Sequence, residues 1–270
     1  MPLFSKNIAE LKDPRRSALY EGTVKGLQCL LDNLEGNIPK LFFLEGRAAI
    51  YLREIESDLL VKLEQQASVI GLHGMDHEDL EGSESKVALS LDEGFEILAN
   101  GVAAIQNAIG AKPRIFRAPY MRISHELLLR LPQLEIEADS SLYLETTTAP
   151  VPYLISNQSN PLWEIPVVKY PEASQKILYL YLWPLFERKR TPEDYIYALR
   201  CLSQNEGSSG NSGVCMVNLH PWHLAYSITE RRYFSNREVE DNILLVNHII
   251  TELFDQAGIE FCMPAILEEQ

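Results

Sequence analysis

The chain has 270 residues, with 24 Lys and Arg against 38 Asp and Glu, which gives a formal net charge of −14. Hydrophobic residues make up 46% and charged residues 23%, which excludes a mainly disordered chain because ample apolar surface can offset chain entropy. The acidic excess also argues against general binding to nucleic acid or anionic membranes, which requires a basic face.

No segment is expected to cross a membrane. The longest apolar run, residues 177–186, contains a proline and falls well short of the roughly 20 residues that a spanning helix needs. The N-terminal residues lack the charged start and apolar stretch of a signal peptide. The four cysteines form no CxxC pair, as is typical of reduced thiols. We therefore expect a cytoplasmic protein, and a homo-oligomer is compatible with this sequence.

Short β-rich runs alternate with helical stretches in chain order. Strands are expected at residues 40–44, 67–72, 114–117, 134–138, 163–168, 214–219 and 259–262, and helices at residues 26–34, 47–66, 91–109, 124–131, 191–203 and 239–257. Residues 146–160 are expected to form a long loop. The alternation predicts an α/β protein with a parallel sheet, and seven or eight strands in this length favour a (β/α) barrel with one domain over residues 1–270.

Two histidines four residues apart, His73 and His77, follow the strand expected at 67–72. Side chains at the C-terminal ends of barrel strands face the active site, and two imidazoles at this spacing can bind one divalent metal. The alternative is a pair of surface histidines in an acidic loop. Three acids lie in that loop: Asp76, Glu78 and Asp79. They would either favour a cation or keep the loop soluble.

Two later strand ends carry further polar and aromatic residues. Arg117 could grip a carboxylate, and Pro119 and Tyr120 could line a pocket for substrate. His220 could serve as a general acid, and Trp222 offers a flat apolar wall that suits a sugar ring. Taken alone, each of these features is also compatible with an ordinary packed strand end or loop.

Together, the motifs resemble those of the polysaccharide deacetylases, the NodB-homology group of carbohydrate esterases. The resemblance covers roughly residues 22–266. The matching segments are residues 72–80 (an H-x-x-x-H metal motif), 117–120 (R-x-P-[YF]), 138–141 (a short Asp-containing stretch), 163–167 (an EIPV strand) and 219–222 (an LHP-type motif).

The resemblance implies a distorted (β/α)7–8 barrel and a metal-dependent hydrolase that removes an acyl group from the nitrogen of an aminosugar or a related amide. Its substrate would be a carbohydrate or an aminosugar. By position, His73 and His77 would bind a divalent metal, which would be Zn²⁺ or one of Co²⁺, Ni²⁺ and Mn²⁺. Arg117 would orient the catalytic base, Asp139 would be its charge partner, and His220 would protonate the leaving amine.

One motif of the family has no clear counterpart. Two carboxylates at the end of its first strand supply the general base and the third metal ligand, whereas counting back from the helix at 26–34 places Arg16 and Ala18 there. Three explanations stay open: Asp13 fills a metal-ligand position after a short insertion, Glu21 moves in, or the base is lost, with or without the metal. The last would leave an inactive barrel that binds a carbohydrate or a glycolipid head group.

Overall fold

A computed structural model describes residues 14–35, 38–82, 87–156, 161–204, 213–254 and 259–267. The chain divides into two compact units, which we describe separately. The sheet unit comprises Pro39–Leu144, Pro150–Val167 and Cys262–Gln270, and the helical unit comprises Met1–Ile38, Glu145–Ala149 and Val168–Phe261. The single domain expected over residues 1–270 stays a prediction.

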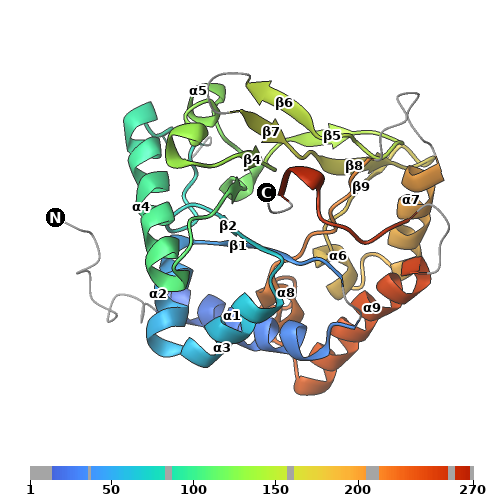
Figure 1. The fold of residues 1–270 in the computed structure, drawn as a ribbon. Coiled ribbons are helices and arrows are strands. Elements are labelled where there is room, and N and C mark those ends of the chain that lie inside the picture. The colour runs from blue at the N-terminus through green and yellow to red at the C-terminus, as the bar shows by residue number, and fades with distance from the viewer. Residues whose placement is uncertain are drawn as a thin grey trace. The chain divides into compact units, whose positions relative to one another are not determined.

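A parallel sheet forms the centre of the sheet unit (Figure 1). In spatial order its strands are β1 (Leu41–Leu44), β2 (Val69–Leu72), β3 (Ile115–Phe116), β4 (Ala138–Asp139), β7 (Leu162–Glu164) and, antiparallel at the end, β6 (Tyr153–Ser156). This confirms the predicted α/β class. The loop expected over residues 146–160 contains β6, and its residues 157–160 lie outside the described part of the chain.

The parallel strands end in a single row. Their last residues are register partners from strand to strand: Leu44, Leu72, Phe116, Asp139 and Glu164. The residues that follow them therefore emerge at one edge of the sheet, which is where open and closed α/β sheets place their functional side chains.

The helices of the sheet unit are α2 (Gly46–Ile55), α3 (Ser57–Gln66), α4 (Leu91–Ile109) and the short α5 (His125–Leu128). Helix α4 has the predicted bounds, because Ser90 and Glu93 form a capping box at its start and Gly110 ends it with a φ of 78°. The single helix expected over 47–66 is instead two helices, which meet at Glu56 with φ −124° and ψ 48°.

Several expected strands of the chain are shorter than predicted or absent. Residues 163–168 divide into β7 and β8 around Pro166, which cannot donate to a strand ladder. Of the strand expected at 134–138 only Ala138 lies in a strand, β4; Leu134 ends a 3₁₀ helix and Glu135 adopts a φ of 65°. The strand expected at 259–262 is not formed.

The helical unit contains α1 (Pro14–Asn33), α6 (Trp183–Phe186), α7 (Pro192–Gln204), α8 (Pro221–Ala225) and α9 (Asn236–Phe254). Its antiparallel strand pairs are β8 (Val167–Pro171) with β9 (Ile177–Tyr179), and β10 (Tyr226–Ser227) with β11 (Arg232–Tyr233). Strand β5 (Tyr143–Glu145) lies at the chain boundary between the units. Instead of the strand expected at 214–219, one parallel bridge joins Asn218 to Tyr181. Across the described ranges, no helix has the length and apolar character needed to cross a bilayer.

Helix α1 packs closely against α8 (Figure 1), and two glycines one turn apart, Gly22 and Gly26, face this contact with different clearances. A Cβ atom added at Gly26 would lie 1.8 Å from the carbonyl oxygen of Pro221. At Gly22 the nearest atom would be Cβ of Trp222 at 3.5 Å, which is ordinary van der Waals contact.

Replacing Gly26 with alanine should therefore lower the free energy of unfolding by about 1–3 kcal/mol, because the backbone of α8 must shift. Gly22→Ala is the matched control on the same helix. It should be neutral or stabilising by up to about 1 kcal/mol, since alanine favours helix over glycine. Urea denaturation of both variants checks the prediction, and equal effects at the two positions would contradict it.

Candidate active site

His73 directly follows β2, and a hydrogen bond to the next strand end fixes its ring. Its Nδ1 lies 2.7 Å from the carbonyl oxygen of Arg117, and the residue is only 7% exposed. Because a carbonyl oxygen can only accept, Nδ1 carries the hydrogen, and the lone pair of the neutral ring is on Nε2. Hydrogen bonds of this kind orient histidines that bind metals through the other nitrogen.

His77 connects the H-x-x-x-H motif at residues 72–80 with the R-x-P-[YF] motif at residues 117–120. Its ring lies edge-on to His73, with 5.0 Å between centroids, and edge-on to Tyr120, with 4.6 Å between centroids. Both His77 and Tyr120 have left-handed backbones, with φ of 56° and 58°. Gly74 permits the close approach, since it has a φ of 78° and an added Cβ would meet Pro119 at 3.3 Å. The structure thus joins four predicted site residues: His73, His77, Pro119 and Tyr120.

The three acids in the loop after β2 stabilise the conformation of that loop. A carboxylate oxygen of Glu78 accepts hydrogen bonds from the backbone N–H groups of Met75 and Asp76, at 3.0 and 2.9 Å. Two ion pairs complete the arrangement: Asp76 with Arg47 at 2.9 Å, and Asp79 with Arg122 at 3.3 Å. These contacts give the three acids a structural role, so they do not form a ligand cluster with the histidines.

The resident side chains fit a divalent metal in part. The tautomer of His73 suits a ligand, and His77 lies beside it. Within the described ranges, however, no group of three or more His, Cys, Asp or Glu side chains is placed to hold a metal ion. Asp13, the third predicted ligand, lies outside the described residues. Among the described residues, the candidate ligands are therefore two imidazoles, and metal binding stays a prediction.

The side chain of Arg117 turns toward β4. Its Nε and one terminal nitrogen donate to the backbone oxygen and the hydroxyl of Ser140, at 2.9 and 2.8 Å, and its guanidinium lies 4.3 Å above the ring of Phe43. Burial of the guanidinium lowers the pKa of Arg117 to about 10, while the nearby Asp139 acts in the opposite direction. These contacts support the predicted charge pairing of Arg117 with Asp139 within one cluster.

Asp139 has a second buried acid as its neighbour. Glu164 is its register partner on β7, and both residues are 0% exposed. Loss of solvation raises the pKa of Asp139. The same effect, followed by the charge of Asp139 and a hydrogen bond between the two carboxyls, raises the pKa of Glu164 to about 10. Such a bond requires one proton between the two carboxyls.

The serines after Asp139 connect this acid pair to the Arg117 strand end. Ser141 donates its backbone N–H and its hydroxyl to Asp139, at 3.0 and 2.6 Å. The same hydroxyl accepts the backbone N–H of Ala118 at 2.8 Å. Residues 117 and 118 are therefore held by groups that Asp139 orients.

In the helical unit, His220 and Trp222 belong to an aromatic cluster. His220 precedes α8, its ring stacks with Trp222 at a 13° angle, and it lies 5.5 Å from the ring of His223. His223 is 3% exposed, and its Nδ1 is 3.0 Å from the hydroxyl of Tyr181. Burial, with a smaller effect of His220, lowers the pKa of His223 to about 2, so this ring stays neutral.

The positions where the first carboxylate motif was sought are helical. Helix α1 runs through Arg16 and Ala18, where gap-free counting places the two acids. Glu21, the second candidate, lies exposed on the same helix, with its carboxylate 3.5 Å from the hydroxyl of Tyr233. The described residues therefore provide no first strand bearing an acid pair before residue 26.

Sequence reasoning missed the partners of the predicted residues. Glu164 lies in a strand motif that had been recognised, but nothing local marks its side chain as the neighbour of Asp139. Ser140 and Ser141 belong to the Asp-containing stretch at 138–141, but no role was predicted for either side chain. His223 was visible three residues after His220, and only the fold shows that it is buried.

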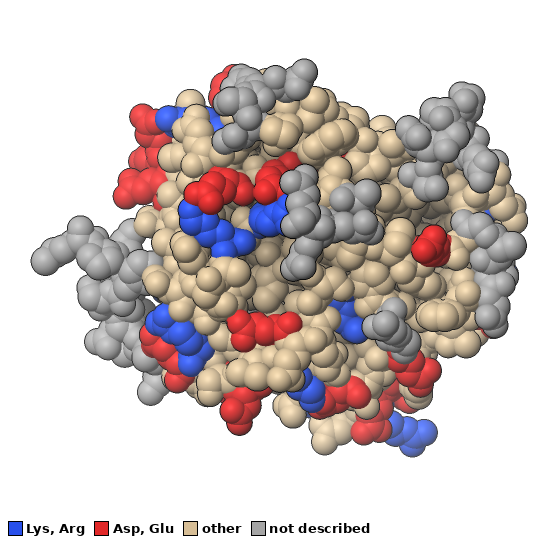
Figure 2. Space-filling view, in the orientation of Figure 1, with Lys and Arg blue, Asp and Glu red and all other residues tan. Residues whose placement is uncertain are grey.

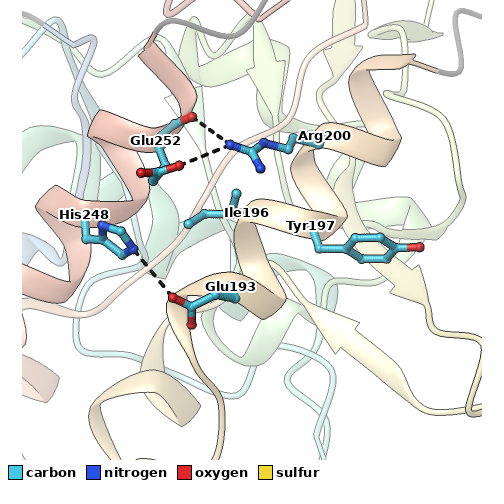
Figure 3. Close-up of a pocket in the computed structure, with 6 residues that line it drawn as sticks. All are labelled: Glu193, Ile196, Tyr197, Arg200, His248 and Glu252. Atoms are coloured by element: carbon cyan, nitrogen blue, oxygen red, sulfur yellow. Dashed lines mark hydrogen bonds and ion pairs between the residues drawn. The ribbon is translucent and has the colours of Figure 1, made fainter.

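A surface groove between α7 and α9 is a competing location for a site (Figure 3). Its lining residues are Glu193, Ile196, Tyr197, Arg200, His248 and Glu252. Arg200 donates to Glu252 at 3.2 Å, and His248 lies 3.6 Å from Glu193. The charged groups thus pair across the groove and join the two helices, which favours a packing role.

On the face that Figure 2 draws, the acidic and basic side chains of the described residues are interspersed, and no single basic patch dominates.

Comparison with known proteins gives a consistent result. Residues 24–138 match the family model of the polysaccharide deacetylases, a segment that includes the His73, His77 and Arg117 motifs. No curated protein sequence matches the chain.

Solved structures extend the likeness over the rest of the fold. A Mycobacterium smegmatis protein assigned to the polysaccharide deacetylases shares 21% identity, with 96% of this chain and 80% of that one covered at a TM-score of 0.61. An allantoinase shares 12% identity, with 94% and 74% covered at a TM-score of 0.59. A Pseudomonas aeruginosa protein assigned to the polysaccharide deacetylases shares 12% identity, with 93% and 74% covered at 0.56. The family match confirms the resemblance to the polysaccharide deacetylases over residues 24–138, and the solved structures show that the chain shares their fold.

Proposed function

We propose that the chain is a hydrolase that removes an acyl group from the nitrogen of an aminosugar or a related amide, and that His73 and His77 bind the divalent cation it uses. The observation that carries this proposal is the hydrogen bond from His73 Nδ1 to the Arg117 carbonyl, with His77 beside the same strand end. It leaves the lone pair of Nε2 available to bind a cation, at the edge of the sheet where deacetylase chemistry is expected.

Each of the remaining residues has a proposed part. A bound cation would supply polarisation of the acyl oxygen and a lowered pKa of water. Tyr120, which is 54% exposed, and Pro119 would contact the substrate. In the helical unit, His220 would protonate the leaving amine, and Trp222 would face a sugar ring.

A second candidate function is carbohydrate binding without hydrolysis. It is favoured by the helical backbone at Arg16 and Ala18, and by the absence of a third metal ligand among the residues that the structure places. In that case the same strand-end surface would bind a carbohydrate or a glycolipid head group and would release no product.

Zinc titration by calorimetry tests the cation site. The wild-type chain should bind about one Zn²⁺, and His73→Ala or His77→Ala should weaken binding by at least about 100-fold, since even outer partners of a metal site are worth about 10–100-fold. His125→Ala, at an exposed position of α5, is the matched control and should bind as wild type.

The affinity should also fall as the pH is lowered, because protonated imidazoles cannot bind a cation. A flat pH profile, or an unchanged affinity in both histidine variants, would overturn ligation by this pair.

Acetate release from N-acetylglucosamine oligomers then separates the two functions. Release that depends on His73 supports hydrolysis, whereas binding of the oligomer without release supports the second candidate.

A further inference from the structure

Two buried carboxyl groups meet next to the candidate site. Asp139 and Glu164 are partners in the parallel ladder of β4 and β7, are both 0% exposed, and are joined by a hydrogen bond. Two neighbouring ionised carboxylates in a low-dielectric interior would repel each other strongly. A shared proton removes that repulsion and provides the donor that the bond requires.

We propose that Glu164 is a positioning residue for the His73 strand end: it stays protonated at neutral pH, donates its proton to the Asp139 carboxylate, and leaves a single anion to balance Arg117.

The groups that face this pair agree with the charge balance. Arg117 is the cation, and the side chains that interact electrostatically with the cluster from β5 and β6 are Tyr143 and Tyr153. Burial and the two acids raise the pKa of Tyr153, so its hydroxyl stays neutral. A neutral Glu164 then leaves one positive and one negative charge, the arrangement that costs least in a buried site.

A continuous series of hydrogen bonds links the pair to His73. One Glu164 oxygen accepts the backbone N–H of Leu142 at 3.1 Å, while Asp139 accepts twice from Ser141. The Ser141 hydroxyl accepts a hydrogen bond from the backbone N–H of Ala118. The same peptide group carries the carbonyl of Arg117, which accepts a hydrogen bond from Nδ1 of His73. If Glu164 lost its proton, repulsion between the two carboxylates would displace Asp139. Through Ser141 and Ala118, this would also displace the Arg117 carbonyl that orients His73.

Three variants of the full chain test the proposal. Glu164→Gln keeps a neutral donor of similar shape, Glu164→Leu removes the donor, and Glu137→Gln is the control. Glu137 is exposed on the approach to β4, where its carboxylate pairs with Arg114 at 2.6 Å. Isotope-edited infrared spectra should show a protonated carboxyl band at neutral pH in the wild type and in Glu137→Gln. Both Glu164 variants should lack this band.

Ring-nitrogen NMR and Zn²⁺ titration then report positioning. Glu164→Gln should retain the Nδ1–H signal of His73 and the wild-type Zn²⁺ affinity, whereas Glu164→Leu should lose the defined tautomer and weaken Zn²⁺ binding by about 10–100-fold. The Zn²⁺ measurement rests on the proposed function, but the infrared and ring-nitrogen measurements do not. If the wild type binds no Zn²⁺, the proposed function fails and these two spectra alone decide the role of Glu164.

Absence of the protonated carboxyl band in the wild type would overturn the proposal. So would a Glu164→Gln variant whose His73 signal matches that of Glu164→Leu, because a neutral donor would then be no substitute. If Glu164→Leu does not fold, the wild-type band and the behaviour of Glu164→Gln still decide between the outcomes.

Discussion

Replacing Arg117 with methionine should lower the free energy of unfolding by about 3–5 kcal/mol, because it leaves the Asp139 carboxylate buried without a cation. Ser140 would also lose the two donors that its backbone oxygen and hydroxyl accept at 2.9 and 2.8 Å. Asp139 cannot recover solvation by turning outward, since its residue is 0% exposed and both of its oxygens are bound by Ser141.

Chemical denaturation measures this effect, and a double-mutant cycle isolates its origin. Arg117→Met combined with Asp139→Asn should cost less than the sum of the single variants, since the double variant leaves neither charge unbalanced. Arg114→Met is the matched control, because Arg114 pairs with Glu137 at the surface, where such pairs contribute less than about 1 kcal/mol. An Arg117→Met variant as stable as Arg114→Met would show that the buried cluster does not rely on this cation.

The stability of the wild-type chain should fall with rising pH relative to Glu164→Gln. The folded state raises the pKa of Glu164 from 4.5 to about 10, through burial first and the charge of Asp139 second. Between these values the folded chain keeps a proton that the unfolded chain releases. The corresponding stability is therefore complete below about pH 4.5 and is lost progressively as the pH rises toward 10.

The difference in the free energy of unfolding between the wild type and Glu164→Gln can change by about 1.4 kcal/mol per pH unit, the value for one proton. Free energies of unfolding for the wild type and for Glu164→Gln, measured from pH 5 to pH 9, should diverge steadily along this slope. Glu137→Gln should run parallel to the wild type, because its carboxyl is exposed. Parallel curves for the wild type and Glu164→Gln would mean that Glu164 does not hold an extra proton in the folded state.

The sequence was most informative where local chemistry decides the structure. Helix α4 was predicted with its observed bounds because Gly110, shortly before Pro113, marks its end, and the structure adds a capping box of Ser90 and Glu93 at its start. His73 and Arg117 were selected because they lie at the ends of expected strands, and the register of β2 and β3 places them side by side.

The remaining features depend on contacts between distant segments. The proton of Glu164 arises from pairing with Asp139, 25 positions earlier, and no local pattern encodes that register. Strand β6 was missed because it forms by pairing with β7 and is largely exposed, so it lacks the apolar alternation of a half-buried strand. Helix α1 covers the positions where a strand with two acids was sought, and it packs against α8, a segment far along the chain, with Gly26 at the closest approach.

The left-handed backbones of His77, Tyr120 and Met121 have a consequence for engineering this chain. Each non-glycine residue in that conformation costs about 1–2 kcal/mol, and the first two carry side chains of the candidate site. A search for thermostability would favour glycine or asparagine at these positions, and it would remove the imidazole and the phenol that meet there. Variants of this protein selected only for heat resistance should therefore be screened for their ligand chemistry as well.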